Sequence, residues 1–168
     1  MPKNIILIGF MGVGKGRTAR ELSRQTGRFT IDTDDLIESA TNVKIKKIFE
    51  KQGEPAFRKL EHELALWLEH NVSNTIVSTG GGFFMVNNIQ KLGTVIHLHA
   101  SIDGILQAVQ NHPNAAKKIH KRPLLQEFDK ARRLYDTRLP LYRQTASLSI
   151  DIEGKDISEV AREIKSQV

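Results

Sequence analysis

GFMGVGKGRT, at positions 9–18, follows directly on an apolar run, Ile5–Ile8, that is typical of a buried strand. Gly9, Gly14 and Lys15 match the phosphate-binding pattern G-x-x-x-x-G-K-[ST]. In that pattern backbone N–H groups surround an anion at the N-terminus of a helix, and the lysine reaches the outer phosphates. Several glycines in one turn cost conformational entropy, which argues against a turn without a ligand. The stretch predicts a strand, a phosphate loop and a helix, the opening unit of an α/β domain.

The residue after the loop lysine departs from this pattern. A serine or threonine hydroxyl is expected there as a direct Mg²⁺ ligand, but this chain has Gly16, followed by Arg17. Mg²⁺ keeps several of its waters in proteins, so we expect a water, steered by Asp32 or Ser78, to replace the hydroxyl. Nucleotide contacts are predicted for the loop and the helix start, at Gly12, Val13, Gly14, Lys15, Gly16 and Arg17.

Short apolar runs alternate with longer amphipathic ones along the rest of the chain. The short runs predict five strands, at Ile5–Ile8, Phe29–Ile31, Thr75–Val77, Thr94–Leu98 and Leu148–Ile152. The longer runs predict helices at Thr18–Gln25, Ile45–Lys51, Pro55–His70, Asp103–Gln110, Gln126–Leu139 and Ile157–Val168. Strands separated by helices need crossover connections. The sequence therefore predicts a single α/β domain, residues 1–168, with a five-stranded parallel sheet flanked by helices on both faces.

The composition excludes several classes of function. The chain has 168 residues and no cysteine, so disulfides, zinc–thiolate sites and thiol nucleophiles are excluded. No apolar stretch is long enough to span a bilayer, and we expect a cytoplasmic monomer with no membrane partner. The net charge of +6 is compatible with an anionic ligand. The dense basic segment at 117–122 has no interleaved aromatic residues, so we expect no nucleic-acid partner.

Acidic residues follow the second predicted strand, and three glycines follow the third. Ligands of open parallel sheets bind beyond the carboxyl ends of the strands, so Asp32 and Asp34 are candidates for holding a metal's water shell and a substrate hydroxyl. A second interpretation stays open, in which Asp34 or Asp35 caps a helix that begins at Leu36, with Glu38 completing a capping box. The glycines permit close backbone approach to a ligand, and they are Gly80, Gly81 and Gly82.

Arginines are the candidates for binding anionic groups, because the planar guanidinium binds phosphate and carboxylate through two hydrogen bonds. Arg58 and Glu61 share a helix face, where the acid can orient the guanidinium or the two can form an ordinary surface pair. Arg122 lies in a polar, basic segment, His112–Pro123, predicted to be a long loop of the kind that serves as a lid. Arg138 opens a second arginine-rich motif. We expect His97 and His99 to pack or to face solvent, and Trp67 to pack.

Taken in order, these pieces resemble the shikimate kinase family. The resemblance is carried by GFMGVGK at 9–15, DTD at 32–34, FRKLE at 57–61, TGGG at 79–82, RPLL at 122–125 and RLPLYR at 138–143. Their order, their spacing and the chain length agree with that family, so the resemblance covers essentially the whole chain. The phosphate loop is shared by many families, whereas its combination with the triple glycine and the two arginine motifs is specific.

The resemblance implies MgATP-dependent phosphorylation of the 3-hydroxyl of shikimate, on the route to aromatic amino acids. It also implies a P-loop kinase fold with a substrate-binding helical segment near residues 33–62 and a lid near 112–124. Lys15 and Arg122 would contact the transferring phosphoryl group. Asp34 would hold and activate substrate hydroxyls, and Asp32 would lie near the metal, through water. The substrate itself would be bound by Arg58, Gly80, Gly81, Gly82 and Arg138, with the arginines on its carboxylate.

Two other functions are weighed against this one. Another small-molecule kinase with a phosphate loop would share the first motif, but it would not be expected to place Arg58, Gly80–Gly82 and Arg138 in this arrangement. A nucleotide-binding regulatory module that has lost catalysis is conceivable because of Gly16. Retention of the other substrate-side residues argues against such a module.

Overall fold

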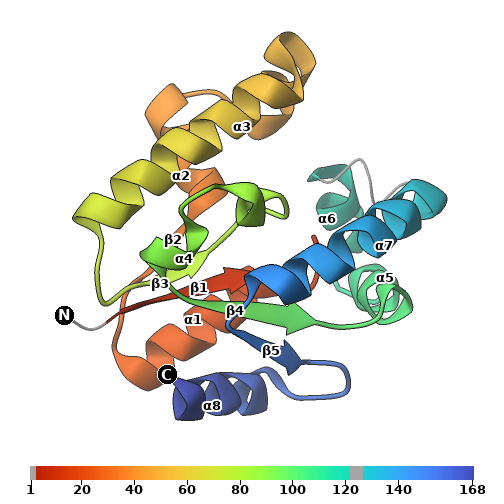
Figure 1. Cartoon of the computed structure of the whole chain (residues 1–168). Helices are drawn as coiled ribbons and strands as arrows, with labels where there is room; N and C mark the ends of the chain where they lie inside the picture. Colours follow the sequence, from red (N-terminus) through yellow and green to blue (C-terminus); the bar gives the residue numbers. More distant parts are fainter. Residues whose placement is uncertain (1–2, 122–126) are drawn as a thin grey trace.

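The computed structural model describes residues 3–121 and 127–168 and has a parallel sheet at its centre (Figure 1). The strands run in the order β2-β3-β1-β4-β5, and every neighbouring pair is parallel. Their bounds are β1 Asn4–Ile8, β2 Thr30–Asp32, β3 Ile76–Ser78, β4 Gly93–His99 and β5 Leu148–Asp151. The five predicted strands and the predicted fold class are confirmed, with only small shifts at the strand ends.

Helices form the connections between these strands. They are α1 Lys15–Thr26, α2 Thr33–Thr41, α3 Ile45–Asn71, α4 Ile89–Leu92, α5 Ile102–Gln110, α6 Ala115–Lys121, α7 Phe128–Thr145 and α8 Ile157–Gln167, with a 3-10 turn η1 at Phe83–Met85. α1 and α8 lie side by side on one face of the sheet, and α7 lies on the other (Figure 1). Within the described ranges, no helix combines the length and the apolar character needed to cross a membrane.

The position of β1 in the sheet places the phosphate loop. β1 is fully buried and pairs with β3 on one side and β4 on the other. Its carboxyl end therefore lies between the ends of two parallel strands that are distant in sequence. This is the edge at which open α/β sheets bind ligands. The loop after β1 and the glycines after β3 consequently meet at one edge of the sheet.

The segment α2–α3 forms a lobe with a small core of its own, made by Ile37, Ile48 and Phe57. α3 spans two predicted helices, Ile45–Lys51 and Pro55–His70, and both are present. They are separated by a kink at Gly53, whose φ of 80° and ψ of 171° are not helical. Glycine tolerates this backbone conformation, and Pro55 suits the first turn of the helix that follows.

The start of α2 corrects one of the two interpretations of the acidic residues. α2 begins at Thr33 rather than at Leu36, and its N-cap is Asp32, whose carboxylate accepts hydrogen bonds from the backbone N–H groups of Asp34 and Asp35. The predicted capping box with Glu38 is wrong, because the Glu38 carboxylate accepts from the backbone N–H of Ile45 at 3.0 Å. Asp34 is therefore not needed as a cap.

Other differences from the sequence-based predictions have local causes. α1 begins at Lys15 rather than at Thr18, directly after Gly14 in a left-handed conformation. α7 continues beyond Leu139 to Thr145, with Pro140 inside the helix. The segment predicted as a loop at His112–Pro123 contains helix α6, and its remaining residues, with Arg122, lie outside the described ranges. The prediction that Trp67 packs is wrong, because Trp67 is 49% exposed on α3.

Candidate active site

The phosphate loop, residues Gly9–Lys15, takes its shape from glycine backbone conformations. Gly12 and Gly14 have φ values of 85° and 99°, a region that residues with a Cβ avoid. Gly9 passes so close to β4 that a Cβ there would lie 2.6 Å from the backbone oxygen of Leu98. Lys15 is buried, and its Nζ donates to the carbonyl oxygens of Gly9 and Phe10 at 2.7 and 3.1 Å. The loop is thus closed over its own lysine at the start of α1, in a geometry suited to an anion.

A hydroxyl and a carboxylate lie beside Gly16. A Cβ at position 16 would be 3.9 Å from the Ser78 hydroxyl oxygen, and that hydroxyl donates to Asp32 Oδ2 at 2.9 Å. Ser78 and Asp32 are therefore close to the position where the usual hydroxyl ligand would stand. Thr18 is fully buried, and its hydroxyl donates to the carbonyl oxygen of Gly14 at 3.0 Å. That bond directs Thr18 at the backbone of its own helix.

Arg58, on α3, pairs with two acidic residues of its own helix. Its NH1 donates to Glu61 at 2.5 Å, and its NH2 donates to Glu54 at 2.8 Å. Burial lowers the pKa of Arg58, but these two carboxylates outweigh burial and raise the pKa overall. The pairing with Glu61, foreseen from the spacing, is much more than a surface contact, because Glu61 is only 1% exposed.

Glu61 is a buried carboxylate with one oxygen directed away from Arg58. Burial raises the pKa of Glu61 above its ordinary value, although the Arg58 guanidinium acts in the opposite direction. Its Oε1 accepts no hydrogen bond from any residue in the described part of the chain. A Cβ added to Gly80 would lie 3.4 Å from this atom and 2.6 Å from Asp34 Oδ1. Gly80 therefore lies against two carboxylates, one from α3 and one from α2.

The glycine triplet allows these side chains to approach the backbone. A Cβ on Gly82 would overlap Arg58 NH1, closer than real Cβ contacts come. The Gly80 backbone N–H donates to the Thr33 hydroxyl at 2.9 Å. Gly81 also borders the phosphate loop, because its Cβ position lies 3.7 Å from the backbone nitrogen of Met11. The glycines thus allow close approach by protein side chains, and close approach to a ligand stays a prediction.

A tyrosine that the sequence analysis left without a role completes this region. The Tyr142 hydroxyl donates to the carbonyl oxygen of Gly81 at 2.5 Å, and Arg138 NH1 donates to the same oxygen at 3.2 Å. The spacing of four residues puts Arg138 and Tyr142 on one face of α7, a signal that could have revealed the pair. Burial raises the pKa of Tyr142 to about 12, so the hydroxyl keeps its proton for this bond.

We call Arg58, Glu61, Gly80–Gly82 and Arg138 the arginine–glycine cluster.

Behind Tyr142 lies His97, which packs as expected. The His97 ring is 2% exposed and stacks on Tyr142, with ring centroids 5.2 Å apart. Its Nδ1 is 3.3 Å from the Ser149 hydroxyl. Burial is the main cause that lowers the pKa of His97 to about 4, so this imidazole is neutral at physiological pH. It supports the tyrosine from behind.

The structure places most predicted site residues together, with Arg122 outside the described ranges. Asp32, Asp34, Arg58, the glycine triplet and Arg138 gather beside the phosphate loop. Within residues 3–121 and 127–168, no three carboxylate or imidazole groups converge as they would in a metal centre built from protein ligands alone. A cation bound there would need ligands from water or from a phosphate.

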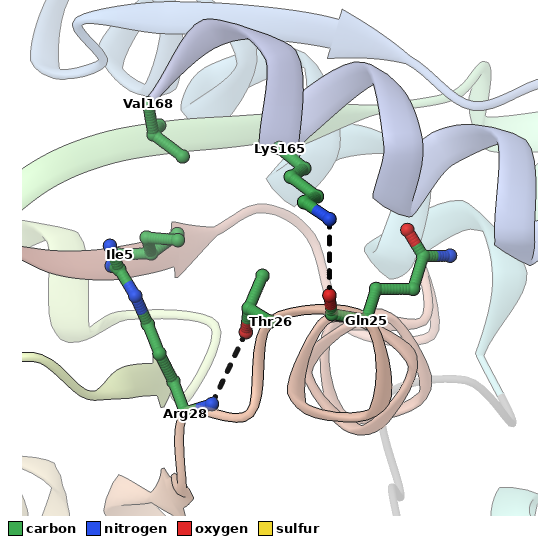
Figure 2. A pocket seen from close by; sticks show the side chains of 6 residues that line it. All are labelled: Ile5, Gln25, Thr26, Arg28, Lys165 and Val168. Carbon is green, nitrogen blue, oxygen red and sulfur yellow. Dashed lines mark hydrogen bonds between the residues drawn. The ribbon is translucent and has the colours of Figure 1, made fainter.

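A separate cavity of about 290 Å³ lies at the opposite end of α1, about 18 Å from the loop along the helix axis (Figure 2). Its cations are already bonded to backbone oxygens. Lys165 Nζ donates to the carbonyl oxygen of Gln25 at 3.2 Å, and Arg28 NH1 donates to that of Lys3 at 3.1 Å. These hydrogen bonds satisfy backbone carbonyl groups near the N-terminus and near the end of α1. We therefore assign the residues around the cavity a structural role.

Comparisons with known proteins identify the family of this chain. The model of the family described as "Shikimate kinase" matches residues 11–168. A protein named shikimate kinase from Helicobacter hepaticus is 40% identical over 162 residues, covering 96% of this chain and 93% of its own. One from Thermus thermophilus is 38% identical over 167 residues, covering 95% and 86%.

A solved structure is similar over nearly the whole chain as well. Shikimate kinase from Acinetobacter baumannii, in complex with shikimate, superposes with a TM-score of 0.84 at 31% identity, covering 99% of this chain and 93% of its own. The family match at residues 11–168 includes most of the phosphate loop and the whole arginine–glycine cluster. The chain belongs to the shikimate kinase family.

Proposed function

We propose that this chain transfers the γ-phosphoryl group of ATP to the 3-hydroxyl of shikimate, giving shikimate 3-phosphate and ADP. Family membership supports the reaction and ATP as the donor. The observation that carries the proposal is that Arg58, Arg138 and Asp34 all border the glycine triplet. A small acid with one carboxylate and several hydroxyls needs arginines at one end and a carboxylate at the other. The Acinetobacter baumannii relative was solved with shikimate bound.

The residues have separate tasks in this proposal. Arg58 and Arg138 bind the carboxylate of shikimate, and the backbone of Gly80–Gly82 lies along its ring. Asp34 holds the reacting hydroxyl and takes its proton as the bond to phosphorus forms. Lys15, with the loop amides from Gly12 to Arg17, stabilises the charge on the transferring phosphoryl group. Arg122 is assigned to the same charge on the strength of the family motif.

Mg²⁺ fits the residues that are present, provided that its contacts to the protein run through water. The Asp32 carboxylate and the Ser78 hydroxyl form a hydrogen-bonded pair next to Gly16. One carboxylate, several waters and the phosphates of the nucleotide are a common Mg²⁺ environment. Bound there, the ion would neutralise charge on the β- and γ-phosphates. Asp32 and Ser78 orient its waters in this proposal, and Thr18 does not contribute a ligand.

We also propose that residues 112–124 act as a lid. Within the described part of this segment, Ile119 of α6 packs on Leu106 and Val109 of α5. A polar, basic segment with few apolar residues suits an element that opens and closes. Backbone amides of α6 are expected to exchange with solvent more slowly once ADP is bound. Equal hydrogen exchange in the free and ADP-bound protein would argue against a lid.

We propose that the enzyme works as a cytoplasmic monomer without nucleic-acid or membrane partners. Sedimentation of the purified protein across a range of concentrations tests the first part. A dimer in which both copies are needed for turnover would contradict it.

A coupled assay of ADP release tests the reaction directly. Release should depend on shikimate and on Mg²⁺. Gluconate and a nucleoside monophosphate, offered at the same concentration, should support no release above the background without acceptor. Equal rates with these acceptors would point to another phosphate-loop kinase. Nucleotide binding without turnover on any acceptor would instead favour the regulatory module.

A further inference from the structure

Arg20 lies one helical turn after Gly16, on the same face of α1. Long side chains on a helix run back toward its N-terminus and cover the preceding turn. Arg20 does so here: its NH1 lies 3.5 Å from where the Cβ of residue 16 would stand. The guanidinium therefore borders the space that a serine or threonine side chain would otherwise occupy. The Ser78 hydroxyl, at 3.9 Å from the same point, borders that space as well.

In the part of the chain that the structure describes, no acidic side chain holds the guanidinium of Arg20 there. It forms no hydrogen bond or ion pair with any residue of 3–121 or 127–168. The oxygens of Asp32, the acid next to this space, accept from Ser78 and from the N–H groups that begin α2. The first turn of α1 has no acidic residue. A cation beside the positive end of a helix is disfavoured unless an anion binds between them.

We propose that Arg20 is a further nucleotide-binding residue, which contacts the phosphates of ATP and ADP in the space left open by Gly16. The inference rests on the proposed function, since it assumes that the phosphate loop binds a nucleotide. The Arg20 cation stands where a metal ligand is missing, so it supplies positive charge next to the phosphates when no metal is bound. Nucleotide binding by this chain should accordingly depend less on Mg²⁺ than binding by an otherwise equal chain without Arg20.

Calorimetric titration with ADP, in EDTA and in Mg²⁺, tests this on the full chain. In EDTA, Arg20→Gln should weaken ADP binding roughly ten-fold, the effect of losing one hydrogen bond to a charged group. The matched control is Arg24→Gln, one turn further along α1, where the arginine pairs with Glu21. It removes the same charge and should leave ADP affinity unchanged. Mg²⁺ should reduce the difference between the two variants, because the ion takes over charge neutralisation.

Two further measurements identify the cause of any loss of ADP affinity. Adenosine has no phosphate, so Arg20→Gln should not change its affinity. Arg20→Lys keeps the charge and should retain most of the affinity for ADP. Equal ADP affinities of Arg20→Gln and Arg24→Gln in EDTA would overturn the inference, and so would an equal loss for adenosine and ADP. If the unsubstituted protein binds no ADP even with Mg²⁺, the proposed function itself is wrong.

Discussion

The phosphate loop and the arginine–glycine cluster face the same sheet edge but are held in shape by different means. The loop depends on backbone conformation, with positive φ values at Gly12 and Gly14 and a lysine bonded to loop carbonyls. The cluster depends on side chains that contact one another, with Arg58 between two acids and Gly81 under Arg138 and Tyr142. A change in the cluster should therefore affect several groups at once, whereas a change beside the loop should stay local.

The largest expected effect is that of Arg58→Ala. Glu61 would be left as a buried carboxylate without its cation, at a cost of about 3 kcal/mol in the free energy of unfolding. Shikimate affinity should fall on the order of 100-fold, because a charged hydrogen-bonded partner is lost. ADP affinity should stay unchanged. Denaturant unfolding and calorimetric titration with each ligand measure these quantities.

The double variant Arg58→Ala with Glu61→Gln separates stability from binding. Removing the buried charge should restore much of the stability but none of the shikimate affinity. An equal loss of ADP and shikimate affinity in Arg58→Ala would show that the two regions are not independent.

Acid should weaken the cluster through His97. Its folded-state pKa of about 4 is below the ordinary 6.5, so the unfolded chain binds more protons between these values. The stability due to neutral His97 is complete above pH 6.5 and is lost as the pH falls toward 4, up to about 3 kcal/mol. The variant His97→Gln should lack this part of the pH dependence of unfolding. The exposed His70, changed to glutamine, is the control; parallel curves for all three proteins would refute the prediction.

A glycine exchange tests how closely Arg58 approaches the backbone. In Gly82→Ala the new Cβ would overlap the guanidinium, so Arg58 must move and shikimate affinity should fall roughly ten-fold. Gly81→Ala is the comparison, because its Cβ would make only ordinary contacts, at 3.5 Å from Arg138 NH1. It should have the smaller effect on shikimate binding. The opposite order would mean that Arg58 adapts easily.

The smallest effect is expected beside the phosphate loop. Gly16→Ser has room for its Cβ and offers an oxygen in place of a water already bound to Mg²⁺. The Mg²⁺ concentration for half-maximal rate should fall a few-fold, with shikimate affinity unchanged. Thr18→Ala should leave the Mg²⁺ dependence as it is, since Thr18 bonds to Gly14. If Thr18→Ala weakens that dependence and Gly16→Ser does not, Thr18 supplies the oxygen.

The sequence was sufficient for the strands and for the glycine loop after β1 because both depend on local patterns. Hydrophobic runs bounded by polar residues gave β1 to β5, and glycine spacing gave the phosphate loop. The start of helix α2 was expected at Leu36 instead of Thr33, because it depends on the side chain of Asp32 bonding to two N–H groups. Helix α6 was missed because a polar segment was held to be a loop, although Ile119 packs on α5.

The sequence could not show which distant segments of the chain lie close together in space. Tyr142 and Arg138 lie far along the chain from Gly81, and only the fold brings both to one carbonyl oxygen. The burial of Glu61, which makes its pair with Arg58 more than a surface contact, also depends on tertiary packing. Arg20 has the helical spacing to reach Gly16, but the lack of a partner for its guanidinium among the described residues is visible only in three dimensions.

The close approach of Gly82 to Arg58 also restricts the order in which this enzyme could have changed over generations. A lineage that first lost the guanidinium would meet a lower barrier at Gly82, because the three atoms nearest to a Cβ there all belong to Arg58. A lineage that kept Arg58 would meet a barrier at Gly82 with any larger residue. Mutational routes through these two positions are therefore directional. Descendants that retain the arginine inherit the glycine with it.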